Sequence, residues 1–147
     1  MNEAIIMANL AFENDEVPVG AVIVYDNKVI GRGFNQVISK KSVAAHAEIN
    51  AINQASQFMK NYRLKNCAIY VTLETCHMCA KAIVDARLDS LYFGANEPKT
   101  GAIQSIDQFL DRKHLNHRVF YSGGHMKEQS SGLLRNFFKI KRINKVS

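Results

Sequence analysis

The sequence predicts an α/β domain in which helices cover both faces of a mixed five-stranded sheet, a three-layer α-β-α sandwich. Three observations indicate this class. Helical and strand patterns alternate along the chain, two strands flank a two-residue connection typical of a hairpin, and two later strands are joined by a helix, as in a parallel βαβ unit. The chain has 147 residues, which suits a single domain over 1–147.

The first half of the chain predicts a helix, a hairpin and a second helix. The first helix is short and largely apolar, and a polar cluster before Pro18 ends it. Asp26-Asn27 tolerates positive φ and therefore predicts the hairpin turn. Ser42 is placed to cap the second helix, with His46 near the first turn. The ranges are helix 2–13, strands 19–25 and 28–33, and helix 43–58.

The second half alternates strands and helices down to the carboxyl terminus. A strand, a helix and a strand follow one another at the spacing of a crossover, which implies a parallel pair. A loop, a short helix, a last strand and a terminal helix complete the domain. The ranges are strand 68–73, helix 76–87, strand 90–93, loop 94–101, helix 105–110, strand 118–121 and helix 127–142.

Composition excludes several classes of protein. Hydrophobic residues make up 47% and charged residues 22% of the chain, as in an ordinary globular protein. No apolar run approaches the ~18 residues of a membrane span, and the amino terminus lacks a basic signal region, so we expect a cytoplasmic protein without membrane contact. Three cysteines, two of them in a Cys-x-x-Cys pair, exclude a disulfide framework and indicate metal or redox chemistry.

Positive charge is concentrated at the carboxyl terminus. The net charge is +6, and the last thirteen residues hold five basic residues and no acidic residue. With two aromatic residues among them, this segment suits contact with a phosphate backbone and with bases. Charge alone favours the simpler interpretation, a solvated helix whose basic last turn suits its dipole. The residues are Arg135, Phe137, Phe138, Lys139, Lys141, Arg142 and Lys145.

The motif His46-Ala47-Glu48 followed by Cys76-His77-Met78-Cys79 predicts a catalytic zinc site. One imidazole and two thiolates are zinc ligands, and three protein ligands leave the fourth position open for chemistry. Cys76 and Cys79 are spaced i, i+3 in a first helical turn, so both sulfurs can face one ion. His46 and Glu48 lie roughly 200° apart around a helix, so the site must be at the helix's N-terminal end, where Glu48 reaches the water position.

Two other interpretations of these cysteines are weaker. A closed structural site would need Cys67 or His77 as fourth ligand, but Cys67 lies most of a strand away and is better interpreted as a buried core thiol. His77 is next to Cys76 on the helix and points off the shared face. A thioredoxin-like redox pair would leave His46 and Glu48 without a role.

The H-x-E and C-x-x-C motifs are those of zinc nucleobase deaminases. The chain resembles the bacterial tRNA-specific adenosine deaminases, within the cytidine-deaminase-like superfamily, over nearly its whole length. Two positions depart from the pattern: Thr75 replaces the usual proline, and Glu97 replaces the usual aspartate. Further segments that carry the resemblance are Val17-Pro18-Val19-Gly20-Ala21, Asn35, Gly94-Ala95, Lys99-Thr100-Gly101-Ala102, Leu115-Asn116-His117-Arg118-Val119 and Phe137-Phe138.

This resemblance implies hydrolytic deamination of adenosine to inosine at the wobble position of tRNA. One zinc ion per subunit is held by His46, Cys76 and Cys79, Glu48 transfers protons, and Asn35 hydrogen-bonds the base. The implied partner is a tRNA anticodon stem-loop, and the implied assembly is a homodimer. The resemblance also makes helix 127–142 an RNA-contacting helix, which reverses the interpretation from charge alone. The implied RNA contacts are Glu97, Lys99, His117, Arg118, Phe137, Phe138, Lys139, Lys141 and Arg142.

Two alternatives remain open from the sequence. A guanine deaminase, or another free-base or nucleoside deaminase, shares the zinc motif, although a small substrate does not need the basic aromatic carboxyl terminus. An inactive, zinc-stabilised RNA-binding module would explain that terminus, although a purely structural zinc ion does not require Glu48.

Overall fold

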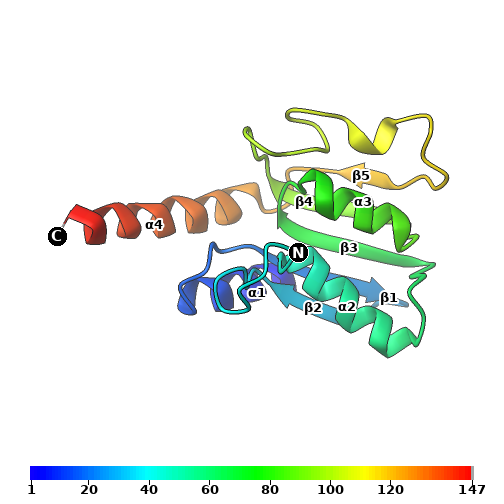
Figure 1. Cartoon of the computed structure of the whole chain (residues 1–147), viewed down its shortest axis with the longest axis horizontal. Coiled ribbons are helices and arrows are strands. Elements are labelled where there is room, and N and C mark those ends of the chain that lie inside the picture. Colours follow the sequence, from blue (N-terminus) through cyan, green and yellow to red (C-terminus); the bar gives the residue numbers. More distant parts are fainter. Residues whose placement is uncertain (147) are drawn as a thin grey trace.

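The computed structural model describes residues 1–146 and has helices on both faces of a five-stranded sheet, which confirms the predicted fold class (Figure 1). The strand order is β2-β1-β3-β4-β5. The pairs β1–β2 and β1–β3 are antiparallel, whereas β3–β4 and β4–β5 are parallel. The elements are α1 (Asn2–Glu13), β1 (Gly20–Tyr25), β2 (Lys28–Phe34), α2 (Ala47–Met59), β3 (Cys67–Leu73), α3 (His77–Asp85), β4 (Ser90–Ala95), a 3-10 turn (Phe109–Asp111), β5 (Phe120–Ser122) and α4 (Lys127–Val146).

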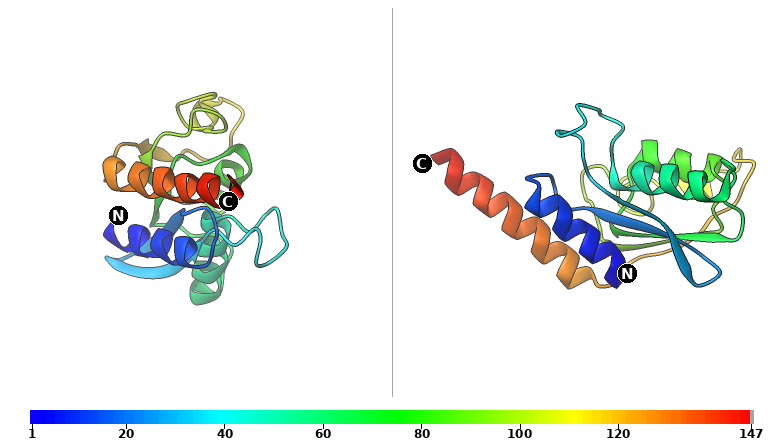
Figure 2. Two further views of the ribbon diagram at one scale, coloured as in Figure 1. Left: turned by 90° about the vertical axis from the view of Figure 1, so that its left-hand side faces the viewer. Right: turned by 90° about the horizontal axis from the view of Figure 1, so that it is seen from below.

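The helices form two layers around the sheet. Helices α2 and α3 lie on one face, and α1 and α4 run side by side on the other, where Phe12 of α1 packs against Phe137 of α4 (Figure 2). The carboxyl-terminal half of α4 extends beyond the sheet (Figure 1). None of the helices in residues 1–146 is long and apolar enough to cross a membrane.

The hairpin forms where the sequence predicts it. Asp26 has φ 52° and Asn27 has φ 62°, the two positive values that a tight turn between twisted strands requires. The prediction of this connection is confirmed.

Close packing against β2 fixes the position of α2. A Cβ atom on Gly33 would lie 2.3 Å from the carbonyl oxygen of Ala47, so only glycine allows the helix to approach the strand this closely. Ala47, Ala51 and Ala55 are fully buried along the facing side of the helix. The first turn of α2, which carries part of the predicted site, is therefore held against the sheet.

Two predicted helices differ from the structure. Helix α2 begins at Ala47, not at residue 43, because Ser42 does not cap it: the Ser42 hydroxyl accepts a hydrogen bond from the backbone N–H of Ala44 and closes a turn ahead of the helix. No α-helix forms over 105–110, where turns lead into Phe109–Asp111. The backbone N–H of Ser105 is directed at a buried carboxylate, as described below.

The remaining boundaries shift by a few residues. Helix α4 continues to Val146, one turn beyond the predicted end, since no glycine or proline follows to stop it. Strand β4 extends to Ala95, and β5 begins at Phe120 rather than at residue 118.

Candidate metal and substrate site

The structure brings His46, Cys76 and Cys79 together at one point. Their ligand atoms all lie within 4.8 Å of one another. The Nδ1 atom of His46 is 3.6 Å from Sγ of Cys76 and 3.5 Å from Sγ of Cys79. A tetrahedral ion with bonds of ~2.3 Å to sulfur and ~2.0 Å to nitrogen separates such donors by about 3.5 Å. The side chains can therefore hold a metal ion with little rearrangement.

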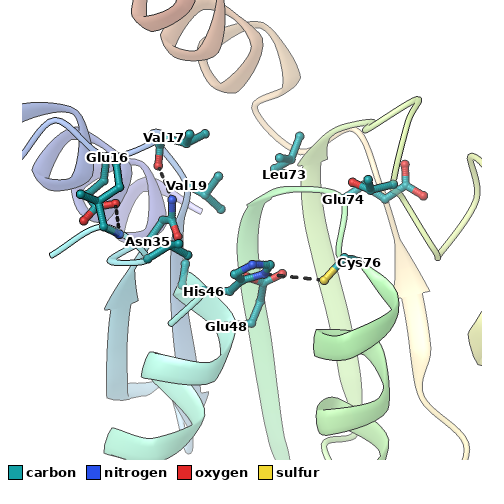
Figure 3. A pocket seen from close by; sticks show the side chains of 13 residues that line it. Glu16, Val17, Val19, Asn35, His46, Glu48, Leu73, Glu74 and Cys76 are labelled. Atoms are coloured by element: carbon teal, nitrogen blue, oxygen red, sulfur yellow. Dashed lines mark hydrogen bonds between the residues drawn. The ribbon is translucent and has the colours of Figure 1, made fainter. Parts of the chain in front are cut away.

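Two helix N-termini converge on this group, as the end-on geometry predicted from the sequence requires (Figure 3). His46 is the N-cap residue of α2 and Cys76 is the N-cap residue of α3, both with extended backbone. Cys79 follows in the first turn of α3. The positive ends of both helix dipoles point at the site and favour thiolates and other anions there.

The pKa values of the two thiols shift in opposite directions. A hydrogen bond from the Cys79 thiol lowers the pKa of Cys76 to about 4, helped by the neighbouring His46. That same bond, together with burial, raises the pKa of Cys79. The hydrogen bond with Cys76 raises the pKa of His46. A bound cation would favour the thiolate form of both cysteines.

Glu48 lies beside these residues and is buried, with 4% of its surface exposed. Burial raises the pKa of its carboxyl group to about 7. A carboxyl group with a pKa near neutrality can both accept and release a proton at physiological pH, which suits general acid–base chemistry.

This pKa predicts how the stability of the metal-free protein depends on pH. The folded-state pKa is about 7 against an ordinary value of 4.5, so the folded protein binds this proton more tightly than the unfolded chain. The contribution of the Glu48 proton to the free energy of unfolding is fully present below pH 4.5 and is lost as the pH rises through 7. We expect Glu48→Gln to gain about 3 kcal/mol relative to the wild type between pH 5 and pH 8. Urea unfolding of both proteins with a chelator measures this difference, and equal pH dependence would contradict it.

A cavity of about 330 Å³ opens next to the metal-ligand group (Figure 3). This is within the ~300–1,000 Å³ typical of small-molecule sites. His46, Glu48 and Cys76 lie at its floor, and Asn35 lines one side. The other lining residues are Glu16, Val17, Val19, Val37, Ile38, Ala47, Leu73, Glu74 and Thr100.

Two buried glutamates lie on opposite sides of this cavity, and the sequence predicted no role for either (Figure 3). Glu16 is 1% exposed and accepts hydrogen bonds from the backbone N–H groups of Ile38 at 3.1 Å and Ser39 at 2.7 Å. Glu74 is 3% exposed and holds residues 96–105 in the same way. Glutamate side chains are almost always exposed, so burial of these two was not expected. The only signals in the sequence are that Glu16 immediately precedes the segment 17–21, which carries the family resemblance, and that Glu74 lies two residues before Cys76.

Asn35, predicted to contact the base, and Glu97 and Lys99, predicted to contact RNA, lie at or near the cavity. Asn35 lines it, and its Nδ2 atom is 3.5 Å from the carbonyl oxygen of Val17. Glu97 and Lys99 lie in the adjacent segment, where a carboxylate oxygen of Glu97 accepts the backbone N–H of Lys99 at 3.0 Å. Thr100, not these two, lines the cavity itself.

His117 and Arg118 lie at the opposite end of the sheet. The Nε2 atom of His117 is 2.7 Å from the carbonyl oxygen of Leu88, two residues before β4. The guanidinium group of Arg118 donates to the carbonyl oxygen of Arg112 at 2.8 Å. Both side chains thus bind the chain's own backbone, far from the metal-ligand group.

The aromatic pair of α4 divides into one buried and one exposed ring. Phe137 is 6% exposed and packs edge-on against Phe12. The centroid of its ring lies 5.5 Å from Nζ of Lys141. Phe138 is 45% exposed. Lys139 and Arg142 are exposed beside it. Phe138, but not Phe137, can therefore stack on a base without loss of core packing.

The alternative metal ligands lie outside the group. Cys67 is buried, and its Sγ atom lies 3.5 Å from the carbonyl oxygen of Lys65. Burial raises the pKa of this thiol to about 11, so it stays protonated. The Nε2 atom of His77 lies 2.8 Å from the carboxylate of Asp107. Both residues thus have structural partners elsewhere.

Comparison with known proteins places these features in context. The family model of the MafB19-like deaminases matches residues 1–142. The tRNA-specific adenosine deaminase of Agrobacterium fabrum is 42% identical over 98% of this chain and 95% of its own length. That of Bacillus subtilis is 37% identical over 99% of this chain and 90% of its own length.

Solved structures give the same picture. One from a study of A-to-I editing by tRNA:A34 deaminases at the wobble position of transfer RNA has a TM-score of 0.88 and 41% identity, covering 91% of this chain and 97% of that chain. The guanine deaminase of Nitrosomonas europaea has a TM-score of 0.77 at 21% identity, covering 92% of this chain and 81% of that chain, and shares the fold.

Proposed function

The chain belongs to the MafB19-like deaminase family, and from this premise we propose that it deaminates adenosine to inosine at the wobble position of tRNA. The observation that carries the proposal is the likeness to a tRNA:A34 deaminase at TM-score 0.88 and 41% identity. The group of His46, Cys76 and Cys79 beside a buried glutamate supplies the chemistry that this reaction needs.

We assign the metal ion as zinc, one per chain. One imidazole and two thiolates are ligands typical of catalytic zinc, and the donor spacing suits tetrahedral coordination. When bound, zinc supplies the Lewis acidity that makes a water molecule nucleophilic near neutral pH.

Glu48 transfers the protons of the reaction. Its carboxylate takes one proton from the attacking water and passes it to N1 of adenine as the C6–O bond forms. It then takes the proton of the new C6 hydroxyl group and passes it to the amino group, which leaves as ammonia as the C6–N bond breaks and the C6 carbonyl forms. Water and adenosine thereby give inosine and ammonia. Because Glu48 is buried, it exchanges these protons with the substrate rather than with bulk solvent.

The cavity accepts a base that has left its stack. Asn35 offers an amide with both donors and an acceptor to the edge of the base. A target nucleotide inside a stacked strand cannot reach the cavity floor, so the substrate is an RNA hairpin loop with a splayed nucleotide. The anticodon stem-loop of tRNA is such a substrate.

The exposed ring of Phe138 predicts a role in RNA binding. We expect Phe138→Ala to weaken binding of an anticodon stem-loop about tenfold, since stacking on one base contributes ~1–3 kcal/mol. Phe137→Ala is the matched control, because it removes the buried neighbour and lowers stability by ~3–5 kcal/mol. Fluorescence anisotropy at low temperature measures both affinities. Equal losses of affinity, or none, would contradict the assignment.

The proposed substrate is tested against the alternatives in one assay. The zinc-loaded protein is incubated separately with an anticodon stem-loop, adenosine, guanine and cytidine, and the products are quantified by chromatography. We expect turnover of the stem-loop alone. Turnover of guanine or a nucleoside would favour a free-base or nucleoside deaminase, and RNA binding without any turnover would favour an inactive binding module.

The homodimer and the cytoplasmic location implied by the resemblance stay predictions. Analytical ultracentrifugation of the zinc-loaded protein tests the first, and we expect the mass of two chains.

A further inference from the structure

The segment 96–105 is folded around the carboxylate of Glu74. One carboxylate oxygen accepts the backbone N–H groups of three successive residues, Ile103 at 3.1 Å, Gln104 at 2.7 Å and Ser105 at 2.9 Å. The other oxygen accepts the backbone N–H of Glu97 at 3.0 Å, the side-chain amide of Asn96 at 3.2 Å and the hydroxyl of Ser105. Successive N–H groups that point at one anion form a nest that favours negative charge.

The carboxylate of Glu74 holds this segment in place. Six hydrogen bonds run from N–H or O–H donors of residues 96–105 to its two oxygens, and Glu74 is 3% exposed. A neutral amide at this position would present N–H donors to some of the same N–H groups.

Backbone contacts join the segment to the metal-ligand strand. The backbone N–H of Ala102 donates to the carbonyl oxygen of Thr75 at 2.8 Å, and Thr75 immediately precedes Cys76. A Cβ atom on Gly101 would lie 2.4 Å from Cδ of Glu74, so glycine is needed for this close approach. The segment is thus hydrogen-bonded directly to the residue that precedes Cys76.

The segment also forms one wall of the cavity. Thr100 and Glu74 line it, and Lys99 is exposed just outside. We propose that Glu74 is a positioning residue, whose buried carboxylate fixes segment 96–105 so that Glu97, Lys99 and Thr100 meet the RNA in a set geometry. This proposal rests on the proposed function, because the segment is assigned to the same substrate.

Limited trypsin digestion of the full chain measures, without any substrate, how often segment 96–105 leaves its folded conformation. Lys99 is exposed, so cleavage after it reports how often the segment leaves its folded shape. Lys41 serves as an internal control. It is exposed in the loop on the opposite side of the cavity, where Glu16 accepts the backbone N–H groups of Ile38 and Ser39. We expect Glu74→Gln to speed cleavage after Lys99 about tenfold without changing cleavage after Lys41. Glu16→Gln should do the reverse.

Steady-state kinetics then separate positioning from simple stability. We expect Glu74→Gln to raise KM for an anticodon stem-loop about tenfold, with kcat within about threefold of the wild type and one zinc ion per chain. Leu88→Ala removes a fully buried side chain at the opposite end of the sheet and is the control for lost stability, with an unchanged KM. Ser105→Ala, which removes only one of the hydrogen bonds, should shift both readouts in the same direction by less.

Three results would overturn the proposal: an unchanged cleavage rate after Lys99 in Glu74→Gln, equal increases after Lys99 and Lys41, or a KM that matches the wild type. If Glu74→Gln fails to fold, an unchanged Ser105→Ala in both readouts would overturn it instead. A wild-type protein that deaminates no RNA would overturn the proposed function. The digestion needs no substrate, so it still tests separately whether Glu74 orders the segment.

Discussion

Replacement of Glu48 by glutamine is expected to reduce deamination of RNA by about 10² to 10⁴-fold while zinc content stays at one ion per chain. Glutamine keeps the size of the side chain but cannot take a proton from water or return it to the leaving amino group. Glu48 is buried at the floor of the cavity, and its carboxylate is the proton carrier that the proposed reaction uses.

Single-turnover kinetics at saturating protein, with zinc measured by atomic emission, test this expectation. Glu13→Gln is the matched control, because it makes the same chemical change at an exposed position at the end of α1 and should behave as the wild type. Unchanged turnover in Glu48→Gln would remove this carboxylate from the mechanism. Loss of zinc together with turnover would instead assign Glu48 to the metal site.

Replacement of Cys79 by alanine is expected to abolish tight zinc binding and to lower turnover at least about a thousandfold, since the metal supplies several kcal/mol of transition-state stabilisation. It removes one of three donors that lie within 4.8 Å of one another. Because zinc binds the folded chain, its loss should also lower the unfolding temperature to that of chelator-treated wild type.

Cys67→Ala is the control for this prediction. It removes a thiol that is equally buried in the core but has its partner in the backbone of Lys65. We expect it to lose some stability through the small cavity it leaves and to retain one zinc ion per chain. Zinc content and thermal unfolding of the two variants decide the matter, and zinc loss in Cys67→Ala would show that the ligand set is wrong.

The metal-ligand group could be predicted from the sequence because its members lie in two short motifs at helix starts. The spacing of Cys76 and Cys79 and the position of His46 relative to Glu48 restrict the geometry before any tertiary structure is known. The hairpin could also be predicted, since Asp and Asn tolerate the positive φ values that Asp26 and Asn27 adopt in the turn.

What the sequence could not predict depends on contacts between distant segments. The sequence analysis predicted a short helix over 105–110, but Ser105 donates its backbone N–H to Glu74, thirty-one residues earlier in the chain. The start of α2 depends on close packing against Gly33 rather than on Ser42. Phe137 and Phe138 are indistinguishable by composition, and only the position of α1 determines which ring is buried.

Inosine formation at a single position of RNA tests the central claim most directly. The zinc-loaded wild type is incubated with an anticodon stem-loop that carries adenosine at the wobble position and at one neighbouring loop position, and the product is sequenced by mass spectrometry. The proposed function predicts a mass increase of about one dalton at the wobble nucleotide only, absent with Glu48→Gln. An unmodified wobble adenosine in the presence of bound zinc and bound RNA would contradict it.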